Sequence, residues 1–318
     1  MSLAVILLTI LGLILFEVVS GIDNAIINAE VLSTMGKKYR RWFAVWGLLL
    51  AVFVIRGLLP WIIIWFTTPS LGPIGALTAT FSSDESVKEK IEQSVPMLLA
   101  FGGTFLLFLF FDWLYLEPKK FGLKIEKMFL SHGVWFYAIV SILLVVLVKL
   151  FLNIDPTLAF AAVLGSAAFF ITNGFRRNAE TNETDLIRKG MKDVSKILYL
   201  IVIDFTFSTD AVLGAFAFTV SVPLILIGNG IGAIVIRQIT LGSIDKIKKY
   251  VFIKNGAMYS ILFLGMAMIL DAFGFNIPSW ASPVITFLVV AFFFLKSGLH
   301  LVRREAREFE NELHKISS

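Results

Sequence analysis

The sequence contains no cysteine and only three histidines among its 318 residues. The absence of cysteine excludes disulfide bonds, thiolate metal sites, iron–sulfur clusters and cysteine nucleophiles. His132, His300 and His314 fall at or beyond the ends of the predicted helices, so a copper or zinc site inside a membrane is not expected. No prosthetic group is expected either.

Charged residues are also scarce. They make up 16% of the chain, whereas hydrophobic residues make up 58%; soluble domains average about 25% charged and about 45–50% apolar residues. The apolar residues form blocks long enough to cross a bilayer, which takes about 20 residues each. We therefore predict an all-α polytopic membrane protein, with 1–318 as one transmembrane domain. The nine predicted helices are 3–32, 42–66, 96–116, 133–152, 157–175, 195–218, 222–241, 256–273 and 282–301.

The basic residues alternate along these segments. Clusters at 37–41, 119–127, 176–196, 246–254 and 303–315 follow every second helix, and the opposite side has only Lys88 and Lys90 in an acidic loop. Basic loops are retained in the cytoplasm. We predict an N-terminus outside and a C-terminus in the cytoplasm, with membrane lipid as a partner. The net charge of +5 then reflects topology, so no nucleic-acid partner is expected. The oligomeric state is not predicted.

Carboxylates occur inside two apolar helices with the same spacing. Glu17 and Asp23 lie six positions apart in Glu17-Val-Val-Ser-Gly-Ile-Asp23-Asn24, and Asp204 and Asp210 lie six apart in Asp204-Phe-Thr-Phe-Ser-Thr-Asp210. A charge at the centre of a bilayer costs at least about 2.5–3.5 kcal/mol, so such residues need a partner, a watery cavity or a function.

A second pattern repeats in the next helix of each copy. Gly47 is followed by Val54-Ile55-Arg56, and Gly228 is followed by Val235-Ile236-Arg237. Two motifs in the same order indicate a duplication. Because the copies are five helices apart, they have opposite orientation, and such inverted repeats are typical of transporters with a site near the midplane. The predicted units are 1–116, an inserted helix pair at 133–175, the inverted repeat at 195–273, and a final helix at 282–301.

Helix geometry bears on how these carboxylates can meet one ligand. Residues six apart in a continuous helix lie about 240° apart around its axis, so both could not face one ion. Ser20 and Gly21 are expected to break the first helix, and Thr206, Ser208 and Thr209 to do the same in the second. Gly228 and Gly232 are expected to let the seventh helix approach closely.

The charges suggest the ligand. Four carboxylates against Arg56 and Arg237, which would balance charge, leave a net charge that one divalent cation neutralises. The available donors are carboxylates, the Asn24 amide, serine hydroxyls and backbone carbonyls. These hard oxygen ligands suit Mn²⁺, Ca²⁺ or Mg²⁺.

The paired acidic segments resemble the signature segments of the TerC family of membrane proteins, named for tellurium resistance. The chain is similar to a long bacterial branch of that family, over roughly residues 3 to 300. The resemblance implies the inner membrane, an inverted-repeat fold of the lysine-exporter superfamily, and manganese export. By the same resemblance, the metal ligands would be Glu17, Asp23, Asn24, Asp204, Ser208 and Asp210.

The leading hypothesis is a secondary transporter that exports a divalent cation, with Mn²⁺ as the first candidate. Export of amino acids or other cationic metabolites is an alternative, and so is a structural membrane protein whose carboxylates only pair with arginines. An intramembrane enzyme is not expected, because the sequence has no Gly-x-Gly-Asp near Asp23 or Asp210 and no membrane-embedded Ser–His pair.

Overall fold

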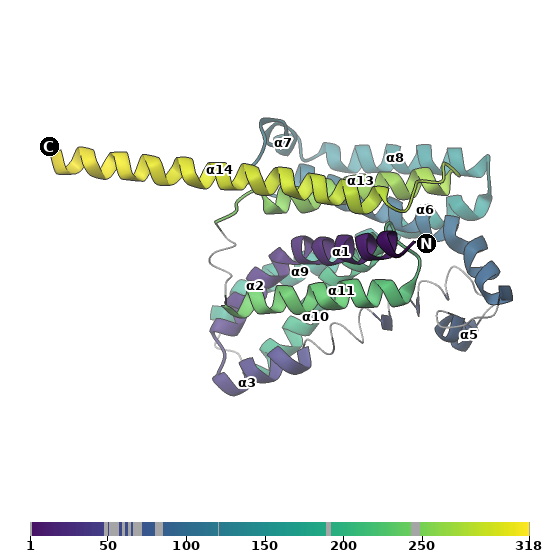
Figure 1. Ribbon diagram of the computed structural model, residues 1–318, viewed down its shortest axis with the longest axis horizontal. Helices are drawn as coiled ribbons and strands as arrows, with labels where there is room; N and C mark the ends of the chain where they lie inside the picture. Colours follow the sequence, from purple (N-terminus) through teal and green to yellow (C-terminus); the bar gives the residue numbers. More distant parts are fainter. Residues whose placement is uncertain are drawn as a thin grey trace.

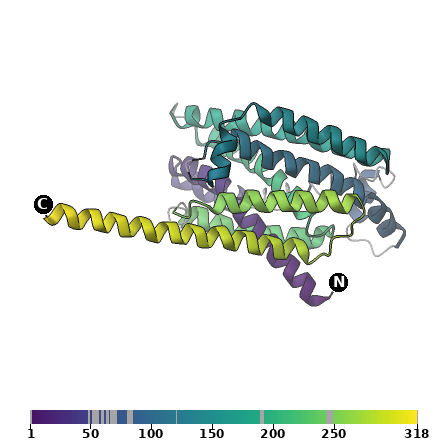
Figure 2. The same cartoon turned by 90° about the horizontal axis from the view of Figure 1, so that it is seen from above.

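A computed structural model describes residues 2–47, 50, 57–58, 61–62, 65, 72–79, 85–119, 121–188, 192–242 and 249–317. These residues are almost entirely helical and contain no strand. The long helices run side by side in a bundle, and the last of them projects beyond the others (Figures 1 and 2). In chain order the elements are α1 (Leu3–Ser20), α2 (Ile22–Ser33), α3 (Lys37–Trp42), the π-helical turn η1 (Phe43–Gly47), α5 (Gly72–Ala79), α6 (Glu85–Leu116), α7 (Lys124–Leu130), α8 (Trp135–Leu152), α9 (Pro156–Arg188), α10 (Asp193–Ala215), α11 (Val222–Gly242), α13 (Ile253–Ala272) and α14 (Ala281–Ser317).

Eight helices within the described part of the chain are long and apolar enough to cross a membrane. They coincide with eight of the nine predicted segments, which supports an integral membrane protein. The remaining predicted segment, 42–66, lies largely outside the described residues. Short turns divide two pairs of consecutive helices. α8 ends at Leu152 before Pro156, which begins α9, and α10 ends at Ala215 before α11 begins at Val222.

Three helices are longer than predicted. α6 begins at Glu85, α9 continues to Arg188 and α14 continues to Ser317. The prediction ended each segment where apolar residues give way to charged ones. Charged residues with long side chains are good helix formers, so the helical backbone continues past the apolar region.

The first predicted segment, 3–32, consists of two helices. α1 ends at Ser20 and α2 begins at Ile22, with Gly21 between them. The Ser20 hydroxyl donates to the carbonyl of Phe16 at 2.7 Å, and a Cβ on Gly21 would lie 2.9 Å from the carbonyl oxygen of Glu17. The comparable break expected at Thr206, Ser208 and Thr209 is absent, because α10 is a continuous helix from Asp193 to Ala215.

The packing holds α2 against α10 and α11. The main core lies among α6, α8, α9 and α13, whereas a smaller core beside α2 includes Val31, Phe43 and Leu200. α11 lies close to α1: a Cβ on Gly228 would be 2.5 Å from Leu13 Cβ, and one on Gly232 would be 2.6 Å from Glu17 Cβ. The close approach expected from these glycines is present.

Candidate functional site

Two polar cavities border α2 on different faces. Asp23, Ile26 and Ile27 of α2 line the larger cavity, whereas Asn24 and Asn28 line the smaller one. Because successive helical residues are rotated by about 100°, a set at positions 23, 26 and 27 and a set at 24 and 28 occupy different faces. Ser20, at the end of α1, lines both cavities.

The smaller cavity has a volume of about 50 Å³ and is lined by α1, α2, α10 and α11. Asn24 and Asn28 are four residues apart on α2, and Asp204 and Ser208 are four apart on α10, so each pair shares one helix face. Glu17 of α1 also lines this cavity and is 1% exposed. The space accommodates an ion with one or two waters.

The asparagines orient the carboxylate of Asp204. Asn24 Nδ2 donates to Asp204 Oδ1 at 2.7 Å, and Asn28 Nδ2 donates to the same oxygen at 2.9 Å. The amide oxygens of Asn24 and Asn28 are buried and have no hydrogen-bond partner among the residues that the structure describes. Buried polar atoms are normally hydrogen-bonded, so two unpartnered acceptors beside a carboxylate form a site that a cation could complete.

Arg237 reaches the smaller cavity from α11. Its Nη2 donates to the carbonyl of Phe43 at 3.0 Å, and its guanidinium carbon lies 4.3 Å from the centre of the Phe43 ring. Arg237 is therefore held at the cavity edge by η1. The other residue predicted to balance charge, Arg56, lies outside the described residues.

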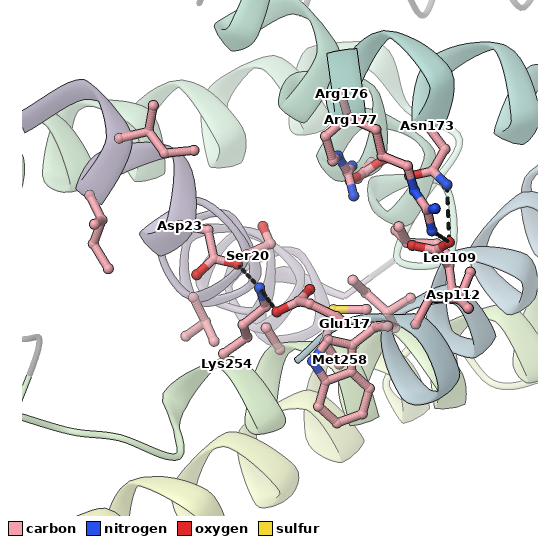
Figure 3. A pocket seen from close by; sticks show the side chains of 18 of the residues that line it. Ser20, Asp23, Leu109, Asp112, Glu117, Asn173, Arg176, Arg177, Lys254 and Met258 are labelled. Carbon is pink, nitrogen blue, oxygen red and sulfur yellow. Dashed lines mark hydrogen bonds and ion pairs between the residues drawn. The ribbon is translucent and has the colours of Figure 1, made fainter. Parts of the chain in front are cut away.

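The larger cavity has a volume of about 390 Å³ and contains residues of both charges. Figure 3 shows two clusters, one around Lys254 and the other around Asp112. Four carboxylates and three basic side chains line it, namely Asp23, Asp112, Glu117 and Asp210 with Arg176, Arg177 and Lys254.

In the first cluster, Lys254 lies between two carboxylates. Its ammonium is 2.7 Å from Asp23 Oδ2 and also pairs with Glu117 (Figure 3). Burial raises the pKa of the Glu117 carboxyl above its ordinary value, while the nearby ammonium of Lys254 acts in the opposite direction and Asp23 adds to the rise.

In the second cluster, consecutive arginines on α9 pair with acids on two other helices. Arg177 donates to Asp112 Oδ1 at 2.6 Å, Asn173 donates to the same oxygen at 3.0 Å, and Arg176 pairs with Asp210. Asp112 is on α6 and Asp210 is on α10. This cluster therefore joins three helices by charge.

Neighbouring contacts hold the first cluster in place. Asn255, next to Lys254, donates to Glu126 Oε2 at 2.8 Å, and the same oxygen accepts from the backbone N–H of Leu123 at 2.8 Å. Lys119 donates to the carbonyl of Trp113 at the end of α6. Lys254 lies at the start of α13, and Glu117 follows the end of α6. These hydrogen bonds connect the start of α13 to α7, and the end of α6 to the segment before α7.

The six residues predicted as ligands of one metal are divided between the cavities. Glu17, Asn24, Asp204 and Ser208 line the smaller cavity, together with the predicted helix-break residues Ser20 and Gly21. Asp23 and Asp210 line the larger one. No group of three or more His, Cys, Asp or Glu residues in the described ranges is placed to hold a metal ion. In the smaller cavity, the carboxylates of Glu17 and Asp204 lie together with the amide and hydroxyl groups of Asn24, Asn28 and Ser208.

Several site residues were missed by the sequence analysis. Asn28 could have been recognised from its position four residues after Asn24, on the same helix face. Arg176, Arg177 and Lys254 were assigned to basic loops, because runs of Lys and Arg next to apolar segments are typical of cytoplasmic loops. Glu117 and Asn173 carried no repeated pattern.

Comparison of the chain with curated proteins and with solved structures gives no match. Residues 22–305 match the family DUF475, described as a protein of unknown function. This match covers most of the chain. It includes all the helices that line the two cavities apart from α1. The chain belongs to the DUF475 family.

Proposed function

We propose that this protein is a secondary transporter that exports a divalent metal cation, with Mn²⁺ as the first candidate, and that the ion binds in the smaller cavity. The observation that carries the proposal is the pair of buried amide oxygens of Asn24 and Asn28, which lie beside Asp204 and have no hydrogen-bond partner within the described part of the chain. Carboxylate, amide and hydroxyl oxygens are the ligands that Mn²⁺, Mg²⁺ and Ca²⁺ prefer.

The charge of the smaller cavity supports a cation rather than an anion. Glu17 and Asp204 contribute two negative charges, and Arg237 contributes one positive charge. Both asparagines donate to Asp204 through neutral amides, which orient the carboxylate and leave its charge in place. An ion there would interact with a desolvated carboxylate, where electrostatic attraction is stronger than in water.

The location favours transport over simple storage of an ion. The cavity lies beside the interruption at Gly21 and is lined by four helices of the bundle. Interrupted helices inside the membrane are typical of transporter sites, and the repeated acidic motifs suggest two inverted repeats that alternate access to the two sides. The charge pattern predicts that the basic segments lie in the cytoplasm. The choice of export as the direction of transport depends on the resemblance to TerC proteins.

The experiment is a Mn²⁺ titration of the purified protein, with Asp204→Asn as the test variant and Asp155→Asn as its control. Asp155 is an exposed acid between α8 and α9, away from both cavities. Wild type and Asp155→Asn should bind Mn²⁺ saturably, and Asp204→Asn should bind at least a hundredfold more weakly while remaining folded. Equal binding by Asp204→Asn would contradict the proposal. Uptake of Mn²⁺ into inverted vesicles then tests transport.

A second candidate is export of an amino acid or another cationic metabolite. The larger cavity, at about 390 Å³ with both carboxylates and basic groups, is the observation that favours it. This candidate predicts that basic amino acids, and not Mn²⁺, stabilise the folded protein against heat, and that Asp23→Asn removes that stabilisation.

A third candidate is a structural membrane protein without a transported ligand. The pairing of all four acids of the larger cavity with basic side chains favours it. In that case neither Mn²⁺ nor an amino acid would raise the thermal midpoint, and substitutions in both cavities would change only stability.

A further inference from the structure

Lys254 occupies the position that a bound cation would occupy between two carboxylates. Its ammonium contacts Asp23 of α2 and Glu117, which follows α6, and the three residues face the larger cavity (Figure 3). An ammonium group is a compact point charge that donates to oxygen ligands, so the two carboxylates already converge on one positive charge.

The three basic residues in this cavity differ in how they are held. The side chain of Arg176 is only 14% exposed and pairs with Asp210, and Arg177, although 48% exposed, carries a rigid planar group that pairs with an acid that Asn173 also holds. The side chain of Lys254 is 33% exposed and lies in the first turn of α13. A flexible four-carbon stem can carry its ammonium from a cavity to nearby water.

The same cavity contains a buried acceptor that the ion pairs do not satisfy. Asp210 is 7% exposed. One of its carboxylate oxygens pairs with Arg176, and the other, Oδ1, is buried with no hydrogen-bond partner among the described residues. Buried acceptors of this kind mark places where a ligand or water completes the site. The cavity therefore has capacity for positive charge beyond what its own side chains supply.

The charges lead to the same conclusion. Four carboxylates face three basic groups, so the cavity carries one excess negative charge. Withdrawal of Lys254 raises this excess to two, which is the charge of one divalent cation. Lys254 and a divalent cation are thus alternatives for the same carboxylates.

We propose that Asp23 and Glu117 form a second divalent-cation site, that Lys254 is a tethered cation which closes this site, and that an ion entering the larger cavity must displace it. Ser20 lines both cavities, so the cavity that holds this second site borders the smaller cavity at that residue. The second site depends on the proposed function only for the choice of Mn²⁺ as the probe.

The test counts Mn²⁺ bound per folded protein by equilibrium dialysis and follows free Mn²⁺ by its electron paramagnetic resonance signal. In the wild type, the second ion must compete with Lys254, so it should bind at least tenfold more weakly than the first. Lys254→Met should strengthen this second binding at least tenfold, and Asp23→Asn should remove it from both proteins. Lys254→Gln repeats the test with a polar neutral side chain, and Lys254→Arg should behave as the wild type.

Lys296→Met is the matched control. Lys296 also lies in an apolar helix, but its ammonium is 5.2 Å from the centre of the Phe252 ring and does not line either cavity. Its substitution should leave both binding events unchanged.

The possible outcomes separate this proposal from the proposed function. If the first event is missing in every protein but Lys254→Met binds one Mn²⁺ that Asp23→Asn removes, the second site stands and the smaller cavity is not an ion site. If the weak event is unaffected by Asp23→Asn, or if Lys254→Met and Lys254→Gln both bind Mn²⁺ as the wild type does, the tethered-cation proposal is wrong.

Discussion

The two cavities differ in what holds their carboxylates. In the smaller one, the donors to Asp204 are the neutral amides of Asn24 and Asn28, whereas in the larger one the acids pair with Arg176, Arg177 and Lys254. Neutral donors fix the direction of a carboxylate but do not cancel its charge, and basic partners do both. Position inside a membrane is therefore a poor guide to which acid is available to an ion.

The comparison predicts different effects for two similar substitutions. Asp210→Asn removes the negative partner of Arg176, whose side chain is largely buried, and should lower the free energy of unfolding by about 3 kcal/mol. Asp204→Asn keeps an oxygen that can accept from both asparagines, so it should cost about 1 kcal/mol and act mainly on Mn²⁺ binding. Thermal unfolding in detergent, with and without Mn²⁺, measures both. A larger stability loss in Asp204→Asn would reverse the comparison.

A substitution without charge can test the packing of the smaller cavity alone. The Cβ of Gly232→Ala would lie 2.6 Å from Glu17 Cβ and 3.1 Å from the carbonyl of Ile14, so α11 must move away from α1. We expect a loss of about 1–3 kcal/mol in unfolding free energy and roughly tenfold weaker Mn²⁺ binding. Gly174→Ala on α9 is the control, because no atom of the described residues lies within 4 Å of the added carbon. Unchanged binding in Gly232→Ala would show that the position of Glu17 does not matter.

The pH dependence of Glu117 sharpens the description of the larger cavity. Because burial raises the pKa of Glu117 in the folded protein, the folded state binds its proton more tightly than the unfolded state does. Stability should then fall as pH rises from the unfolded pKa, about 4.3, through the folded value. Glu117→Gln lacks this titration, so its stability relative to the wild type should increase with pH over the same range. A difference that is flat with pH, measured by thermal unfolding, would argue against a desolvated carboxyl.

The smallest effect is expected outside both cavities. Asp155 precedes Pro156 at the start of α9, and its Oδ1 accepts from the backbone N–H of Thr157 at 2.8 Å. This hydrogen bond lowers the pKa of Asp155, so its stabilisation is present above the unfolded pKa and is lost as pH falls through the folded one. Asp155→Ala should lower the thermal midpoint slightly at neutral pH, leave Mn²⁺ binding unchanged, and differ less from the wild type in acid.

The sequence predicted the helices better than the site. Long apolar runs identify membrane helices because backbone hydrogen bonds must be satisfied within each segment, and the Asp155-Pro156 turn follows from proline geometry. The partners of the acids could not be predicted in the same way. Arg176 belongs to a helix that continues past its apolar part, and Lys254 starts another, so a linear charge pattern assigns both to loops.

The division of the acids could have been anticipated in part. The six-residue spacing places Glu17 and Asp23 on different faces of a helix, and the interruption at Gly21 does not bring them into one cavity. Asp204 and Asp210 are likewise separated along the unbroken α10. The spacing alone does not predict how each helix is rotated about its axis relative to its neighbours. That rotation depends on packing contacts such as the one between Gly232 and Glu17.

The length of α14 makes its far end a sensitive reporter of movement in the bundle. Its membrane-crossing stretch ends at Arg304, and the helix continues to Ser317, about 20 Å farther at 1.5 Å per residue. It packs on α13, which carries Lys254, and on α1, which ends at the Gly21 interruption. A rotation of about 10° in the packed part would displace the far end by roughly 3–4 Å relative to the membrane surface. Rearrangements that are small inside the cavities would therefore become larger displacements at the projecting end of α14 (Figure 2), where a spectroscopic label would report them in real time.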